Sequence, residues 1–162
     1  MRYLIALTAL LTSTAVSAQS IGDLGPAVTA EDVVTWRVAA EHGERGGEAS
    51  VVLRAVIADG WNLYAVGSPV GRPLEVELLQ APDGVSAAAP RQSTPREGTD
   101  PALGVPYLYF AGEARVELPL RIGRAVARGR HRVRGAVRYA VCDDSVCLAP
   151  TESRFRVPLV VR

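Results

Sequence analysis

The stretch from Arg130 to Val141, RHRVRGAVRYAV, is the most regular part of the chain. Successive residues of an extended strand point to opposite sides, so this pattern gives the segment one mainly apolar side and one charged side. The first side carries His131, Val133, Val137, Tyr139 and Val141, and the second carries Arg130, Arg132, Arg134 and Arg138. The pattern predicts a long strand with one buried face and one face in solvent.

The rest of the chain continues in short alternating segments separated by clusters of Gly, Pro and Asp. No long stretch has apolar residues at helical spacing, so we expect an all-β protein. The first two segments are predicted to form a hairpin with Val51, Leu53 and Ala55 on one face. About eight strands at this spacing are typical of an immunoglobulin-like antiparallel β-sandwich. The strands are expected near residues 36–40, 50–57, 73–78, 107–110, 114–122, 130–141 and 155–159. The segments 107–110 and 114–122 are expected to pair with each other around Ala111-Gly112-Glu113.

The segment from Ala87 to Pro106 has a different composition, rich in Pro, Ser, Thr, Gly and charged residues. It is longer than most connections in a compact domain, and loops of this length are often functional. We therefore expect a long loop here, between two strands.

The first residues have the composition of a secretory signal peptide. Arg2 precedes an apolar run from Tyr3 to Val16, and small residues at Val16 and Ala18 favour cleavage before Gln19. The run is too short to span a bilayer, and no cysteine follows it to carry a lipid anchor. We expect residues 1–18 to be a signal peptide and residues 19–162 to be one domain without a membrane span. The domain is predicted to be periplasmic or otherwise exported.

The charge balance gives no support to two classes of partner. Removal of Arg2 with the leader leaves 17 Arg against 17 Asp and Glu, and the chain has no Lys. A formally neutral protein has little long-range attraction for polyanions. We therefore expect neither nucleic acid nor an anionic membrane as a partner.

The chain has two cysteines, Cys142 and Cys147. The residues between them, Asp143-Asp144-Ser145-Val146, have the composition of a turn and join the long strand to the final strand. Cysteines that face each other across antiparallel strands lie close enough to bond, and exported thiols are usually paired. We expect a disulfide at a hairpin tip, with its sulfurs near solvent.

Such a bond has two interpretations. Closing so short a loop contributes roughly 2 kcal/mol of stability, which is modest for a structural disulfide. A position at the tip would instead allow a partner thiolate to attack in line. Asp143 and Asp144 should raise the pKa of both thiols, so we expect slow reaction with small oxidants and thiols. The residues alone support a structural and a redox disulfide about equally.

Other chemistries have weaker support. Both histidines are distant from the cysteines in sequence and no second Cys or His pair exists, so no metal or other cofactor is expected. No nucleophile-elbow motif indicates hydrolysis. The arginines from Arg121 to Arg138 alternate with apolar residues, which favours a solvated strand face over a basic binding patch. Four aromatic residues are expected to pack in the core or at a sheet edge: Trp36, Trp61, Tyr107 and Tyr109.

Three segments together resemble the N-terminal periplasmic domain of the thiol:disulfide interchange protein DsbD. The resemblance covers nearly all of the chain after the leader, and its specific part is the tyrosine-led cysteine motif. The segments are Gly60-Trp61-Asn62-Leu63-Tyr64, Tyr107-Leu108-Tyr109, and Tyr139-Ala140-Val141-Cys142-Asp143-Asp144-Ser145-Val146-Cys147-Leu148-Ala149-Pro150 followed by Thr151-Glu152.

The resemblance implies a fold and a set of roles. The fold is an immunoglobulin-like sandwich whose cysteine pair exchanges electrons with thioredoxin-like or DsbD-like redox proteins through transient mixed disulfides. Cys147 would be the sulfur that a partner attacks, and Cys142 would resolve the mixed disulfide. Tyr64 would be the aromatic residue beside the site, and residues 97–104, with Leu103, would form a cap over it. The other residues expected to support the site are Tyr139, Asp143 and Asp144.

The chain also departs from the family's pattern. The best-known members have one more residue between the cysteines, and the segment from Thr99 to Leu103 has no aromatic residue. The chain ends after the sandwich, so the electron donor is expected to be a separate molecule. We predict a periplasmic thiol-disulfide exchange module that relays electrons through Cys142 and Cys147. The alternative is an immunoglobulin-like binding or accessory module with a purely structural disulfide.

Overall fold

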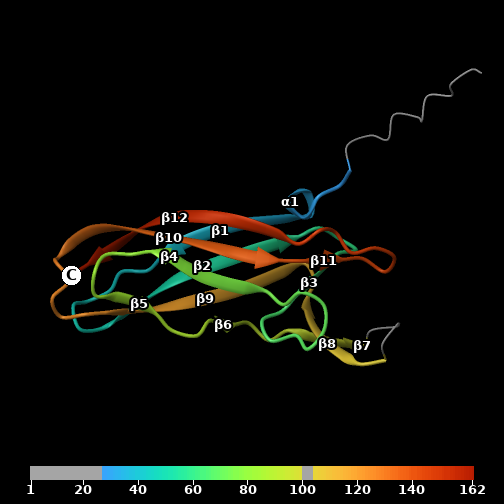
Figure 1. The fold of residues 1–162 in the computed structure, drawn as a ribbon, viewed down its shortest axis with the longest axis horizontal. Helices are drawn as coiled ribbons and strands as arrows, with labels where there is room; N and C mark the ends of the chain where they lie inside the picture. The colour runs from blue at the N-terminus through green and yellow to red at the C-terminus, as the bar shows by residue number, and fades with distance from the viewer. Residues whose placement is uncertain (1–26, 100–103) are drawn as a thin grey trace, which may run out of the picture.

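The chain folds into an elongated antiparallel β-sandwich, which confirms the predicted fold class (Figure 1). The structure is a computed structural model that describes residues 27–99 and 104–162. A single short helix, α1 (Ala30–Val33), precedes the first strand, and no described helix has the length and apolarity needed to cross a membrane. The predicted signal peptide, residues 1–18, lies outside the described residues.

One sheet is built on the predicted N-terminal hairpin. β1 (Val34–Ala40) and β2 (Glu48–Ile57) run antiparallel, and β9 (Glu113–Ile122) pairs with the other edge of β2. Val51, Leu53 and Ala55 are all buried on one face, as their alternation predicted. Two short strands, β5 (Val85–Ala87) and β6 (Arg91–Gln92), pair with the remaining edge of β9.

The second sheet contains the long strand predicted from the arginine alternation. β10 (Gly129–Tyr139) pairs along its length with β12 (Thr151–Val161), and its other edge pairs with β4 (Glu75–Gln80). The apolar side of β10 is buried, and Arg130 and Arg132 on the opposite side are exposed.

The core lies between these sheets and is mostly aliphatic. Leu53 from β2, Leu118 from β9 and Leu159 from β12 are each no more than 1% exposed. Burying one such side chain contributes about 1.5–3 kcal/mol, so this layer provides the main stabilisation of the fold. Trp36 and Trp61 pack against the same core, as expected from the sequence.

A third sheet, built of short strands, lies at one end of the sandwich, where the cysteines are found (Figure 1). Its strands, in spatial order, are β11 (Val141–Cys142), β3 (Asn62–Tyr64), β8 (Pro106–Phe110) and β7 (Arg96–Thr99).

Two expectations about the middle of the chain were wrong. Residues 87–106 are not a plain loop, because they include β6 and β7; strands of two to four residues are too short to show an alternation. The segments 107–110 and 114–122 are strands, but β8 pairs with β3 and β7 while β9 pairs with β2. Periodicity predicts that a segment is extended, but it does not identify the strand's partner.

Candidate functional site

The cysteines lie at the tip that joins β10 to β12, as the sequence predicted. Cys142 and Cys147 form a disulfide and face each other as an isolated antiparallel bridge, with Cα atoms 4.0 Å apart. Just inside this pair, the N–H of Leu148 donates to the carbonyl of Val141 at 2.9 Å. The cysteines therefore occupy a non-hydrogen-bonded position of the ladder, where opposing side chains approach most closely.

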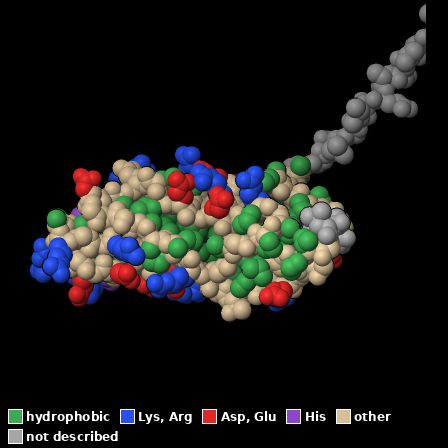
Figure 2. Space-filling view, turned by 60° about the horizontal axis from the view of Figure 1, so that its bottom comes forward, with side chains coloured by type: hydrophobic (Ala, Val, Ile, Leu, Met, Phe, Trp, Pro, Cys, Tyr) green, Lys and Arg blue, Asp and Glu red, His purple; other side chains and the backbone are tan. Residues whose placement is uncertain are grey.

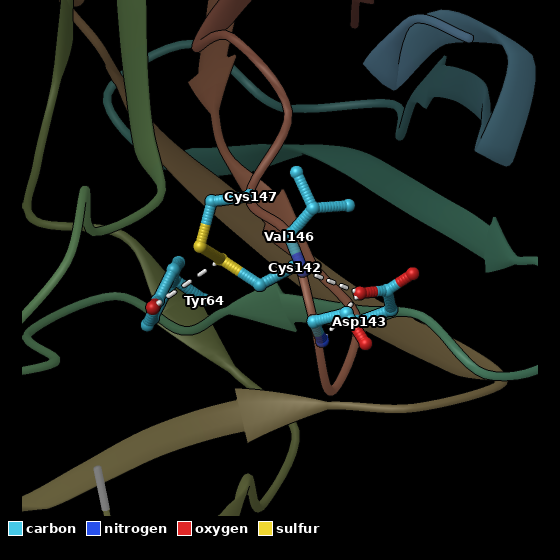
Figure 3. The surroundings of a disulfide bond; sticks show 6 residues. Tyr64, Cys142, Asp143, Val146 and Cys147 are labelled. Carbon is cyan, nitrogen blue, oxygen red and sulfur yellow. Dashed lines mark hydrogen bonds between the residues drawn. A yellow bond between two sulfur atoms is a disulfide. The ribbon is translucent and has the colours of Figure 1, made fainter. Parts of the chain in front are cut away.

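Asp143 holds the turn between the two cysteines (Figure 3). Its backbone N–H donates to the carbonyl of Val146 at 2.9 Å, and its Oδ1 accepts the N–H groups of Ser145 and Val146 at 2.7 Å each. These two accepted bonds, that of Ser145 first, lower the pKa of the Asp143 carboxyl because they favour its charged form. The site therefore keeps a negative charge beside the disulfide except in strong acid.

The two cysteines differ in exposure, so the expectation that the cysteine pair lies near solvent holds for Cys147 and not for Cys142. Cys142 is only 9% exposed, because β11 pairs with β3 and places Cys142 opposite Asn62. Cys147 is exposed, and its neighbour Val146 is an exposed apolar side chain, with 52% of its surface accessible. A thiolate that arrives from solvent therefore meets Cys147 first, with an apolar contact available beside it.

A hollow of about 580 Å³ opens beside the disulfide. The Tyr64 hydroxyl lies 3.4 Å from the Sγ of Cys142, and it is the donor because a disulfide sulfur carries no hydrogen (Figure 3). The ring of Tyr107 meets Tyr64 edge to face at 5.8 Å and stacks on Tyr109 at 5.1 Å. Side chains from β3, β7, β8 and the cysteine hairpin line the hollow: Asn62, Tyr64, Thr99, Tyr107, Cys142, Asp143, Asp144, Ser145, Val146 and Cys147.

The hollow brings together some of the predicted supporting residues and omits others. Tyr64, Asp143 and Asp144 line it, but Tyr139 lies inside the sandwich, fully buried and edge to face on Trp36. The break at Ala140 separates Tyr139 in β10 from Cys142 in β11, and the two strands belong to different sheets. Leu103, with the rest of residues 100–103 of the predicted cap, lies outside the described residues.

Tyr107, expected from the sequence to serve in core or edge packing, lies in the wall of the hollow. Its position depends on a glycine in the neighbouring strand. Gly98 is the register partner of Tyr107, and a Cβ at residue 98 would lie 2.7 Å from the Cε1 of the ring. Likewise, a Cβ on Gly71 would overlap the ring of Tyr64. Both tyrosine rings therefore lie directly on a glycine, and at Gly98 the glycine belongs to the edge strand β7, where aromatic rings often cover a glycine.

Gly98→Ala should change access to the disulfide. The added methyl group forces the Tyr107 ring away from its present position, and overpacking of this kind costs roughly 1–3 kcal/mol. Because Tyr107 is a wall of the hollow, its displacement should increase the rate at which a small thiol reduces the disulfide several-fold. The measurement is the pseudo-first-order rate of reduction by dithiothreitol.

Glu97→Ala is the matched control for this prediction. It removes an exposed side chain from the adjacent position of β7 and leaves the contact with Tyr107 unchanged. A Gly98→Ala rate equal to that of the wild type, with the fold intact, would show that Tyr107 does not limit access.

Comparison with known protein families gives one match. The model of "Thiol:disulfide interchange protein DsbD, N-terminal" matches residues 28–159. This range includes β1 to β11, all but the last two residues of β12, and the tyrosines and both cysteines of the site. By sequence comparison, no curated protein matches the chain.

Solved structures show the same fold. The reduced N-terminal domain of DsbD from Neisseria meningitidis is 23% identical, with a TM-score of 0.56 over 83% of this chain and 89% of that one. The complex between the N-terminal domains of DsbD and PilB from the same organism gives 20% identity and a TM-score of 0.55, over 83% and 88% of the chains. The N-terminal periplasmic domain of ScsB from Proteus mirabilis is 17% identical, with a TM-score of 0.55 over 77% of this chain and 46% of that one.

Proposed function

Because the chain belongs to the family of the N-terminal domain of the thiol:disulfide interchange protein DsbD, we propose that it relays electrons between exported proteins through its Cys142–Cys147 bond. One observation carries the proposal. The disulfide lies at an accessible tip with one sulfur-bearing residue exposed and the other shielded, beside a hollow of about 580 Å³. A structural bridge needs no such asymmetry, whereas directed exchange needs one sulfur that a partner can reach.

The reaction begins when a partner thiolate attacks the Sγ of Cys147. The new sulfur–sulfur bond joins the partner to Cys147, the Cys142–Cys147 bond breaks, and Cys142 leaves with the electron pair as a thiolate. A second thiol of the partner then attacks its own mixed-disulfide sulfur, which releases Cys147 as a thiolate. The partner leaves oxidised by two electrons, and this chain holds two reduced cysteines. The same steps in reverse pass the electrons to an oxidised acceptor.

Tyr64 is positioned to assist the first step. Its hydroxyl already lies 3.4 Å from the sulfur that becomes the leaving thiolate. A hydrogen bond donated to a thiolate favours the charged form, and a leaving group with a lower pKa departs faster. Asp143 and Asp144 oppose this effect by placing negative charge in the same hollow. Their repulsion would keep the reduced thiols protonated and slow their oxidation by small molecules.

The proposed partners are separate redox domains. One similar structure is a complex of the DsbD and PilB N-terminal domains, which shows that a domain with this fold can bind another protein domain. A thioredoxin-like donor is the partner implied by the family. The predicted signal peptide would place the exchange in the periplasm.

The reduction potential tests this proposal. The disulfide should equilibrate with glutathione or with a thioredoxin-like protein at a potential less negative than about −300 mV, the range below which structural bridges usually lie. The fraction reduced can be measured by thiol alkylation and mass spectrometry across a series of redox buffers. A potential well below that value would contradict a role in relay.

A further inference from the structure

A second feature of the surface lies at the end of the sandwich opposite the cysteine hairpin, where the C-terminus is found (Figure 1). The loop after β1, the loop after β9 and the end of β12 meet there. The N–H of Gly43 donates to the carbonyl of Val160 at 3.0 Å, and the N–H of Ile122 donates to the carbonyl of Gly47 at 2.9 Å. Backbone hydrogen bonds therefore hold these segments together.

Four arginines and Glu44 line a hollow of about 640 Å³ at this end. Among the described residues, none of the four forms an ion pair, whereas Arg115, Arg138 and Arg154 each pair with a glutamate. Figure 2 shows arginine side chains gathered at the left-hand end of the molecule. We call this set the arginine pole: Arg45, Arg124, Arg128 and Arg162, with Glu44 beside them.

The arginine pole and the cysteine hairpin make the molecule electrically asymmetric. Asp143 and Asp144 line the hollow beside the disulfide, and no arginine of residues 27–99 and 104–162 does. The balanced charge of the sequence is therefore divided between the two ends of the long axis. The expectation, drawn from net charge, that an anionic membrane is not a partner does not apply to the end that carries the arginine pole. In physiological salt, charges more than about 8 Å apart are largely screened from each other. A surface that approaches one end consequently responds to that end and not to the net charge.

The chemistry of the pole favours phosphate groups on a surface. Guanidinium groups bind phosphate oxygens through two parallel hydrogen bonds. Protein–protein interfaces usually have an apolar centre, but none of the exposed large hydrophobic side chains of the described residues lines this hollow. An anionic membrane surface requires only positive charge near the headgroups. We propose that the arginine pole docks the protein on anionic phospholipids, with Cys147 at the far end and directed away from the membrane.

Vesicle binding tests this proposal. The processed protein, purified from the periplasm, should co-sediment with vesicles of phosphatidylglycerol and phosphatidylethanolamine, but not with vesicles of phosphatidylcholine. Added salt should release it. Each arginine near an anionic surface contributes about 1 kcal/mol, so replacing Arg45, Arg124 and Arg128 with Gln should weaken binding about a hundredfold. Gln keeps the aliphatic part of the side chain, including the Cγ of Arg124 that packs near Gly46.

A matched control carries the same change in charge on another face. Arg37→Gln, Arg54→Gln and Arg91→Gln together remove three exposed arginines from the sheet that contains β1, β2 and β6. This variant should bind vesicles almost as the wild type does. Equal losses in the two triple variants would overturn the assignment to the pole. Failure of the wild type to bind phosphatidylglycerol vesicles would overturn the membrane as the partner and leave an acidic protein as the next candidate.

A second readout tests the orientation. If the pole faces the membrane, a soluble thiol should reduce the disulfide of vesicle-bound protein at the same rate as that of free protein. A marked slowing on binding would place the cysteine hairpin at the membrane and contradict the proposed orientation. This result does not depend on which proteins exchange electrons with the chain, so the docking and relay proposals can fail separately.

Discussion

Replacing Cys142 with serine should leave the protein covalently linked to its redox partners through Cys147. In this variant the exposed Cys147 can still attack an oxidised partner and form a mixed disulfide, but the sulfur that would resolve the bond is missing. After incubation with periplasmic extract, adducts should appear on a non-reducing gel and disappear on reduction. Mass spectrometry of the linked peptides should identify Cys147 as the attachment point.

Cys147→Ser is the matched control for this experiment. It retains Cys142, which is 9% exposed and whose Sγ lies 3.4 Å from the Tyr64 hydroxyl. A buried thiol reacts slowly, because an attacking or attacked sulfur must be reached along the axis of the breaking bond. The adduct yield of Cys147→Ser should therefore be at least about tenfold lower than that of Cys142→Ser. Equal yields from the two variants would show that exposure does not select the reacting sulfur, and an absence of adducts from Cys142→Ser would remove the main support for exchange.

The position of the site could be predicted from the sequence because its determinants are local. Alternation of arginine with apolar residues fixes both the strand and the buried face of β10, since a shift of one residue would expose the apolar side. The turn composition between Cys142 and Cys147 then places both sulfurs at the following bend. The structure confirms the disulfide and its location at the tip.

The walls of the site could not be predicted in the same way, because tertiary contacts determine them. Tyr139 and Tyr107 both lie in segments that the sequence predicts to be strands, yet the first is buried against Trp36 and the second lines the hollow. The difference follows from the sheet to which each strand belongs. Gly98 does indicate the position of Tyr107, because a glycine opposite an aromatic residue often accommodates its ring. It could be recognised only once the register of β7 and β8 was known.

Removal of both sulfurs should abolish exchange and leave the protein folded. Cys142→Ser with Cys147→Ser should lower the free energy of unfolding by only about 2 kcal/mol, because the disulfide closes a short loop. The turn also keeps its other contacts: the bond between Leu148 and Val141 and the two bonds accepted by Asp143. Denaturant unfolding of this variant and of the oxidised wild type measures the difference. A binding module with a structural disulfide predicts a different outcome, in which the double variant still binds its partner as the wild type does.

Leu53→Ala should have the opposite effect: it should lower the stability of the fold and leave disulfide exchange intact. Leu53 is fully buried in the middle of β2 and does not line the hollow beside the disulfide, and truncation of such a leucine costs about 2–5 kcal/mol. This variant should lose more stability than the double serine variant and still exchange disulfides at temperatures where it remains folded. If the double serine variant proved less stable than Leu53→Ala, the disulfide would be a main support of the fold. If instead the double serine variant loses exchange and Leu53→Ala loses stability, the sulfurs serve the reaction and the core serves the fold.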